Sequence, residues 1–410
     1  MSDTGFQHIG PLWAHLHPKT DTPKPDATGH IQPAIPRKPR FPLRAEPTWA
    51  DGIVRSADGT QPIERPVSGG WGDASGSGHP DGNPVRTARG RGDIDGPCFD
   101  IDVPPNGYAW WYIDGISHCG TRAISIIGFI GSVFSPWYRW SGRKSPRNHC
   151  CINVATYGPG GRFTMTDRGE SALRTSQNIF EVGPSKMTWM GDKLVIDISE
   201  MGAPPMVGPV RGKVTLTPKF VTNLEVPLTP SGTHVWRPFA PSADIDVQLE
   251  ADGWQWDGHG YFDANFGTAA LEDDFSYWTW GRYPHSKGSV CFYDADRRDG
   301  STLDVGLLFQ NDGEVQLLNS PPKVAMKRSL WQVRRETRAD AGYKPVQVKG
   351  MLDAPFYSRS AVKTQFAGEE VVGVHEALDL NRFRSKIVKP MLACRVPRRA
   401  KWRFDTPPAE

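Results

Sequence analysis

Short hydrophobic runs alternate with polar, glycine- or proline-containing breaks from about residue 108 onward. The first set covers residues 109–113, 121–129, 150–156, 162–166, 193–198 and 212–217. A second set follows a proline-rich joint at 218–230 and covers residues 233–237, 245–250, 258–263, 275–281, 289–293, 303–309 and 330–335. Runs of this length and spacing are typical of β-sandwiches and β-barrels. They predict an all-β protein with two consecutive β units.

The chain divides into four predicted segments. Residues 1–96 contain 14 Gly and 13 Pro and few adjacent apolar residues, a composition typical of a disordered extension. Residues 97–225 and 226–381 are the two predicted β domains, and the second carries the candidate active site described below. Residues 382–410 form a basic tail, with nine Lys or Arg and no Asp or Glu between positions 382 and 403.

Composition supports a turn-rich β protein. The 410 residues include 43 Gly and 37 Pro, which excludes a helical bundle or coiled coil. The 15 Trp indicate that aromatic side chains fill much of the interior. The formal net charge of +3 does not suggest a nucleic-acid-binding protein.

Cellular location is predicted from the cysteines and the apolar stretches. The six Cys lack the spacing of a disulfide framework or a C-x-x-C pair, so we expect reduced thiols and a cytoplasmic protein. The N-terminus lacks the pattern of a signal peptide. The longest apolar stretch, residues 123–134, has 12 residues and is too short to span a bilayer.

Two short segments place titratable and aromatic side chains on one strand face. Alternate residues of a strand share a face, so His259, Tyr261 and Asp263 lie together, as do His234 and Trp236. If both faces line one cavity, an acid, an imidazole and aromatic rings meet there. The structural alternative is that the aromatic residues and His234 fill a core and that Asp263 caps a turn.

Other clusters of titratable residues are weaker candidates for a functional site. His118-Cys119 and His149-Cys150-Cys151 lack a partner pair at zinc spacing, so no metal site is expected. The acidic run 272–274 is interpreted as a solvated turn. Asp244 and Asp246 share a strand face and resemble the acid motif of triterpene cyclases over two residues only. Nucleotide-binding and common hydrolase motifs are absent from the sequence.

Longer motifs resemble the bacterial carotenoid 1,2-hydratases, also called hydroxyneurosporene synthases. In the first half they are GYAWWYIDG (107–115), IGFIGSVFSPWY (127–138), NHCCINVATYGP (148–159) and MTDRG (165–169). In the second half they are GHGYFD (258–263), LEDDF (271–275), TRAD (337–340), DAPFYSRS (353–360) and VHEALDLNRF (374–383). The resemblance covers residues 107–395 and leaves the first hundred without a counterpart. The sequence also departs from the family at His118-Cys119, where acidic residues are common.

The resemblance implies two lipocalin-like β units and the addition of water to the terminal C1–C2 double bond of an acyclic carotenoid such as neurosporene or lycopene. It implies no cofactor. The family's histidine–tryptophan and tyrosine–aspartate pairs fall on His234, Trp236, Tyr261 and Asp263, the same-face residues identified above.

Alkene hydration assigns a role to each of these residues. Asp263 is expected to protonate C2, which requires burial to raise its pKa by roughly three units. His234 is expected to hydrogen-bond Asp263, resupply the proton or orient the water. Trp236 and Tyr261 are expected to stabilise the C1 cation. We expect His259, Trp278 and Trp280 to contact the substrate.

The basic tail has two interpretations. A frayed, solvated tail is the simpler one, but cations interleaved with apolar residues also suit an anionic membrane. Because a C40 hydrocarbon resides in the bilayer, we expect peripheral binding at the cytoplasmic face of a bacterial inner or intracytoplasmic membrane. Two alternative functions stay open: a lipocalin-like carrier of an apolar ligand, and an acid-initiated carotenoid isomerase or cyclase.

Overall fold

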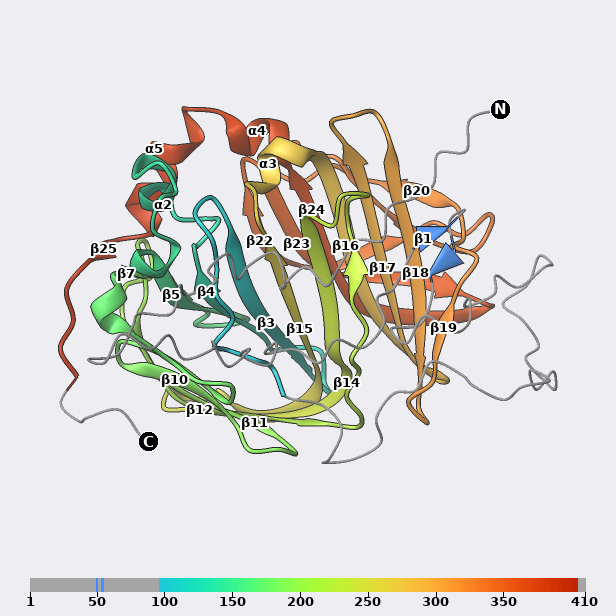
Figure 1. Cartoon of the computed structure of the whole chain (residues 1–410). Coiled ribbons are helices and arrows are strands. Elements are labelled where there is room, and N and C mark those ends of the chain that lie inside the picture. The colour runs from blue at the N-terminus through green and yellow to red at the C-terminus, as the bar shows by residue number, and fades with distance from the viewer. Residues whose placement is uncertain (1–48, 51–52, 55–95, 405–410) are drawn as a thin grey trace, which may run out of the picture.

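The computed structural model describes residues 49–50, 53–54 and 96–404, and nearly all of the regular structure in these ranges is β-sheet (Figure 1). The all-β prediction is therefore confirmed. Most of the segment 1–96, predicted to be a disordered extension, lies outside the described residues, except for a two-stranded sheet of β1 (Trp49–Ala50) and β2 (Ile53–Val54).

A large curved sheet accounts for the first β unit (Figure 1). Its strands, in spatial order, are β25 (Arg398–Arg399), β7 (Asp167–Arg168), β5 (Cys150–Tyr157), β4 (Ala123–Ile130), β3 (Tyr108–Ser117), β15 (Gln255–Gly267), β14 (His234–Leu249), β12 (Pro209–Pro218), β11 (Leu194–Met201), β10 (Ser185–Trp189), β9 (Ile179–Val182) and β8 (Leu173–Thr175). Two short strands branch from it, β6 (Phe163–Thr164) beside β5 and β13 (Val226–Pro227) beside β14. The strand pairs are antiparallel except for β25 with β7.

A second antiparallel sheet forms the other β unit. Its order is β19 (Val315–Leu317), β18 (Thr302–Gln310), β17 (Gly288–Arg297), β16 (Phe275–His285), β24 (Glu369–Asp379), β23 (Tyr357–Phe366) and β22 (Val346–Ala354). A separate hairpin joins β20 (Lys323–Met326) to β21 (Arg335–Arg338). The short helices are α2 (Pro136–Trp140), α3 (Leu271–Asp274), α4 (Leu380–Arg384), α5 (Val388–Arg395) and the 3₁₀ turns η1 (Pro146–Asn148) and η2 (Glu170–Ala172).

The predicted boundary after residue 225 does not match the division between the sheets. Strands β14 and β15 lie in the first sheet, where β14 pairs with β12 and β15 pairs with β3. The chain passes to the second sheet through α3, between Gly267 and Phe275. The proline-rich joint at 218–230 is a connection within the first sheet, because the strands that follow it pair back onto earlier strands.

Period-two alternation in the central strands produces two cores. In β3, Ile113 packs in a core formed by the first sheet alone, together with Ile126 and Phe262. The neighbouring Tyr112 faces the other way, into a core shared by both sheets. We call this second cluster the inter-sheet core; it contains Trp236, Tyr261, Trp278, Trp280, Tyr293 and Leu307, among others. The candidate chemistry lies in the inter-sheet core, because the predicted same-face residues point toward it.

The basic segment from Arg382 onward is folded against the rest of the protein as far as residue 404. Arg398 forms an ion pair with the buried Asp167, and β25 adds to the edge of β7. Lys389 is buried beside Phe383, with its Nζ 3.2 Å from the ring centre. The interpretation of this segment as a frayed tail is therefore wrong within residues 382–404.

Candidate active site

Asp263 lies in the middle of β15 and accepts two short hydrogen bonds at one oxygen. The Nε1 of Trp236 and the hydroxyl of Tyr261 each donate to Oδ2 of Asp263 at 2.8 Å. Tyr261 is two residues away on the same strand, and Trp236 reaches across from β14, where it lies opposite Asn265. The predicted grouping of Trp236, Tyr261 and Asp263 is therefore present, and the alternative of Asp263 as a turn cap is wrong because β15 continues to Gly267.

Burial dominates the acidity of Asp263. The side chain is only 3% exposed, and this burial raises its pKa to about 8, although the hydrogen bonds from Tyr261 and Trp236 act in the opposite direction. The negative charges of Glu376 and Asp114 add smaller upward contributions. Near neutral pH the carboxyl group therefore holds its proton, as a general acid must.

Aromatic rings from both sheets surround this carboxyl group. The ring centre of Tyr261 lies 5.2 Å from that of Trp280 on β16, and the ring centre of Trp236 lies 5.5 Å from that of Tyr293 on β17. Trp278 packs 5.9 Å from Tyr293 in the same core. Trp278 and Trp280, which are predicted to contact the substrate, thus lie on β16 of the second sheet and face the inter-sheet core.

His234 does not contact Asp263, contrary to the prediction of a hydrogen bond between them. Its Nδ1 lies 2.8 Å from the hydroxyl of Tyr108, and its Nε2 lies 2.8 Å from Oδ2 of Asp274. Burial lowers the pKa of His234, and Asp274 counteracts this in part. The reason is register: His234 lies opposite Gly267, at the end of β15 beside Tyr108.

The acidic run 272–274 is not simply a solvated turn. It forms α3, and Glu272 is buried with ion pairs to Arg139 and Arg143. Asp274 is partly exposed, and its Oδ2 contacts Nε2 of His234. Two of the three carboxylates therefore have structural partners that the local sequence does not reveal.

His259 lies on the face predicted for it but near other partners. Its Nδ1 is 3.0 Å from Nη1 of Arg282. Burial, followed by the charge of Arg282, lowers the pKa of His259 to about 3, so the imidazole is neutral. It belongs to the edge of a buried ionic cluster, where its hydrogen-bond partner is Arg282 and not Asp263.

The buried ionic cluster joins the two sheets and was not predicted. Asp114 on β3 accepts Nε of Arg282 at 2.6 Å and Nη2 of Arg359 at 3.0 Å, and the Tyr112 hydroxyl donates to it at 2.7 Å. Arg359 also pairs with Glu376. Burial alone would raise the pKa of Asp114, but the two guanidinium groups hold it below its usual value. Tyr112, Asp114, Arg359 and Glu376 occur in the motifs GYAWWYIDG, DAPFYSRS and VHEALDLNRF, whereas Arg282 lies outside them. Membership in these motifs was the only sequence signal for the cluster.

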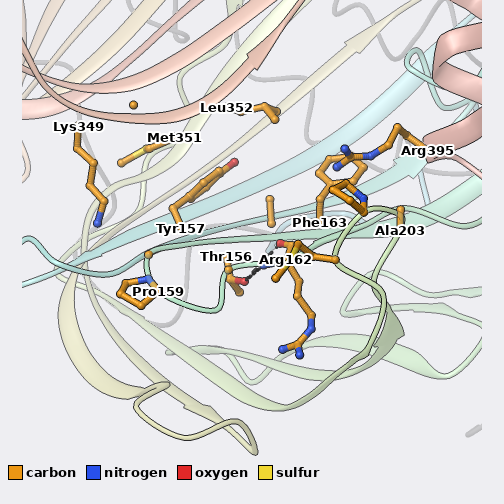
Figure 2. Close-up of a pocket in the computed structure, with 16 residues that line it drawn as sticks. Thr156, Tyr157, Pro159, Arg162, Phe163, Ala203, Lys349, Met351, Leu352 and Arg395 are labelled. Carbon is orange, nitrogen blue, oxygen red and sulfur yellow. Dashed lines mark hydrogen bonds between the residues drawn. The ribbon is translucent and has the colours of Figure 1, made fainter.

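An open cleft lies where β5 of the first sheet faces β22 of the second (Figure 2). Its volume is about 520 Å³. Tyr157 and Phe163 line one side, Met351 and Leu352 the other, and these four side chains pack on the inter-sheet core. The guanidinium of Arg395, from α5, lies 5.0 Å from the Phe163 ring. No Asp or Glu is among the residues that line the cleft.

Arg359 connects this cleft to the surroundings of Asp263. Its guanidinium carbon lies 5.6 Å from the ring centre of Tyr157, which lines the cleft, and 5.4 Å from that of Tyr112. Tyr112 is the direct strand neighbour of Asp263 in the register of β3 and β15. Contacts between buried side chains therefore connect the cleft to the neighbour of Asp263, whereas Asp263 itself does not line the cleft.

The remaining predicted clusters have structural partners. His149 lies 3.2 Å from Asp167 and 3.0 Å from Arg398, whereas Cys150 and Cys151 are buried. Within the part of the chain that the structure describes, no group of three His, Cys, Asp or Glu side chains is arranged to hold a metal ion. The side chain of Asp244 is largely exposed and lies 3.9 Å from Lys219, which does not support an acid motif there. No helix in the described ranges has the length and apolarity needed to cross a membrane.

The chain is similar in sequence to known carotenoid hydratases. The family model "Carotenoid hydratase CrtC" matches residues 126–405. An acyclic carotenoid 1,2-hydratase from Cereibacter sphaeroides is 61% identical over 280 residues, which cover 68% of this chain and 100% of that protein. The enzyme of the same name from Thiocapsa roseopersicina is 40% identical over 403 residues, covering 97% and 99%. A crystal structure of kievitone hydratase from Nectria haematococca is 12% identical with a TM-score of 0.42, covering 68% of this chain and 90% of that one.

The full-length match changes one expectation. Because the Thiocapsa roseopersicina protein aligns with 97% of this chain, the first hundred residues do have a counterpart in the family. The Cereibacter sphaeroides protein is covered completely by 280 residues of this chain. The relatives of this chain therefore differ in whether they carry a segment that corresponds to its first hundred residues. With a family model that covers more than half of its length and these two relatives, the chain belongs to the carotenoid hydratase family.

Proposed function

We propose that this protein is an acyclic carotenoid 1,2-hydratase in which Asp263 is the general acid. The observation that carries the proposal is a buried carboxyl group with a pKa of about 8, held by an indole and a phenol in an aromatic core. Hydration of an isolated trisubstituted alkene begins with protonation of C2, which leaves a tertiary cation at C1. A protonated acid in a water-poor aromatic environment can donate the proton that this first step requires.

The aromatic rings around Asp263 stabilise the cation. The rings come from both sheets and pack in two pairs. The ring centres are 5.2 Å apart for Tyr261 and Trp280 and 5.5 Å apart for Trp236 and Tyr293. A cation over such a ring gains about 2 kcal/mol or more when water is excluded. His234 does not hydrogen-bond Asp263; bound between Tyr108 and Asp274, it positions the end of β14 that carries Trp236.

The substrate follows the seam between the sheets. An acyclic carotenoid such as neurosporene or lycopene is a long hydrocarbon that must bring one terminal double bond to Asp263 while its chain extends outward. The apolar side chains of Tyr157, Phe163, Met351 and Leu352 line the cleft and pack on the inter-sheet core, so the hydrocarbon chain enters there. The reaction requires water and an acid, both of which this arrangement can provide without a cofactor.

The protein collects its substrate at a membrane surface. Trp140 on α2 is 51% exposed, and Ile387 and Met391, in or next to α5, are 78% and 43% exposed. Helices α2 and α5 contact each other, so these apolar side chains belong to one end of the molecule. The exposed cations Arg384 and Lys386 lie beside them. This combination suits peripheral binding to the anionic cytoplasmic face of a bacterial membrane.

Incubation with lycopene in H2(18)O tests the proposed reaction. A hydratase gives a hydroxylated carotenoid that carries the heavy isotope at C1. Shifted or cyclised products without the label would instead identify an isomerase or cyclase, and tight binding with unchanged lycopene would identify a carrier.

A further inference from the structure

Asn265 follows Asp263 on the same face of β15 and is buried in the same place. Its side chain is 4% exposed, and its strand neighbours are Trp236 on β14 and Trp110 on β3. The Nδ2 of Asn265 donates a long hydrogen bond of 3.3 Å to Oδ1 of Asp263. Asn265 therefore lies beside the oxygen of Asp263 that Trp236 and Tyr261 do not contact.

The two oxygens of Asp263 differ in their hydrogen bonding. Oδ2 accepts two bonds at 2.8 Å, which engage both of its lone pairs. The proton of the neutral acid consequently resides on Oδ1. The transferable proton is thus on the side of Asn265.

The amide oxygen of Asn265 is an unused acceptor. Among the described residues, Oδ1 of Asn265 has no hydrogen-bond partner although it is buried. A buried acceptor left without a partner destabilises the folded protein, so its presence indicates a bound ligand or a catalytic role. On the facing strand β16, Nε1 of the buried Trp280 is likewise without a partner among the described residues. A water molecule in a buried polar site needs two to four such partners, and Oδ1 of Asn265 supplies one acceptor directly beside Asp263.

We propose that Asn265 binds the water molecule that captures the carbocation. This inference rests on the proposed hydration reaction. Asp263 first transfers its Oδ1 proton to C2, and the positive charge develops at C1. The water donates one hydrogen bond to Oδ1 of Asn265, and its oxygen lone pair forms the new bond to C1. An O–H bond of that water then breaks, and its proton returns to the Asp263 carboxylate, so that the acid is regenerated and no external proton is consumed.

Without the bound water, the cation has another fate. It loses a proton and returns to an alkene, either the substrate or a double-bond isomer. In D2O, an exchanged Asp263 delivers deuterium, so a cation that reverts leaves deuterium in recovered lycopene. Hydroxylation and deuterium exchange therefore report separately on water capture and on protonation.

The Asn265→Leu variant tests the proposal, because leucine keeps the approximate volume and removes both polar atoms. The purified full chain is incubated with lycopene in D2O, and both hydroxylated product and deuterated lycopene are quantified by mass spectrometry. The expected result is a loss of hydroxylation by about 100-fold or more, with deuterium exchange retained. Asn265→Ser, which keeps a small hydroxyl acceptor, is expected to recover part of the hydroxylation, and it replaces the leucine variant if that variant does not fold.

Two outcomes would overturn the role of Asn265. Unchanged hydroxylation would show that the water is held elsewhere, and an equal loss of hydroxylation and exchange would show that Asn265 only supports Asp263. Failure of the proposed function is distinguishable from both, since the unaltered protein would then give no hydroxylated lycopene.

Discussion

The indole nitrogen of Trp236 donates to Oδ2 of Asp263 at 2.8 Å, which links two neighbouring strands through the acid. The hydroxyl of Tyr261 donates to the same oxygen. Both bonds favour the ionised form, yet burial keeps the pKa of Asp263 at about 8. Asp263 is therefore protonated at neutral pH. Its pKa is close enough to that pH for the proton to be released during the reaction.

The pH dependence of turnover follows from this balance. Since the reaction needs protonated Asp263, kcat/KM is expected to fall as pH rises above about 8. Tyr261→Phe removes a donor that lowers the pKa, so the alkaline limb of the pH profile should move to higher pH. Tyr283→Phe is a matched control, because Tyr283 is equally buried but bonds Thr337. An alkaline limb that stays in place in Tyr261→Phe would show that another group sets it.

The buried ionic cluster is expected to contribute to stability. Asp114→Asn leaves Arg282 and Arg359 in the core without the carboxylate that compensates them. Removing one partner of a buried ion pair costs about 3–5 kcal/mol, and urea denaturation of the variant should show a loss of this size. Lys363→Met, which breaks the exposed pair with Glu370, is the control and should change little. Equal stability of Asp114→Asn and the unaltered protein would contradict the account.

Membrane binding is expected to depend on the end of the molecule that carries α2 and α5. Replacing Trp140, Ile387 and Met391 together by serine removes exposed apolar surface and should abolish most flotation with phosphatidylglycerol-containing liposomes. Met190→Ser, at a 58% exposed position after β10, is the control for loss of a surface apolar residue. Flotation of the triple variant at the level of the control would mean that another surface binds the membrane.

The cleft is expected to hold the hydrocarbon chain. Met351→Arg places a charge between the two sheets and should raise KM for lycopene about tenfold or more, because a charge would have to be desolvated beside the polyene. Val348→Arg lies on the same strand at a 59% exposed position and should leave KM unchanged. The same KM for both variants would exclude this route for the substrate.

Part of the site could be predicted from the sequence because it depends on local geometry. Tyr261 and Asp263 are two apart on one strand, so their shared face follows from strand periodicity, and the family resemblance identified Trp236 as their partner. The contact of His234 with Asp274 could not be predicted, since it depends on the register between β14 and β15 and on α3. The proposed role of Asn265 also requires knowledge of which atoms lack partners.

The fold shows the same division. Individual strands were recognisable from alternating runs. The pairing of β15 with β3, however, joins residues more than 140 positions apart, and because of it the boundary between the sheets lies after residue 267 and not after residue 225. The ionic cluster has the same origin: Asp114 and Arg359 are 245 positions apart in the chain. Pairings of this kind are determined by the whole packed structure and leave no local pattern.

Turnover of lycopene by Asp263→Asn tests the central claim most directly. Asparagine keeps the shape of the neutral acid but cannot donate a proton to C2, so formation of hydroxylated product should fall by about 100- to 10,000-fold, while circular dichroism and the urea midpoint show a folded protein. Asp244→Asn, at a largely exposed position on β14, is the control and should keep full activity. Hydration by folded Asp263→Asn at the rate of the unaltered protein would contradict the assignment of Asp263 as the acid.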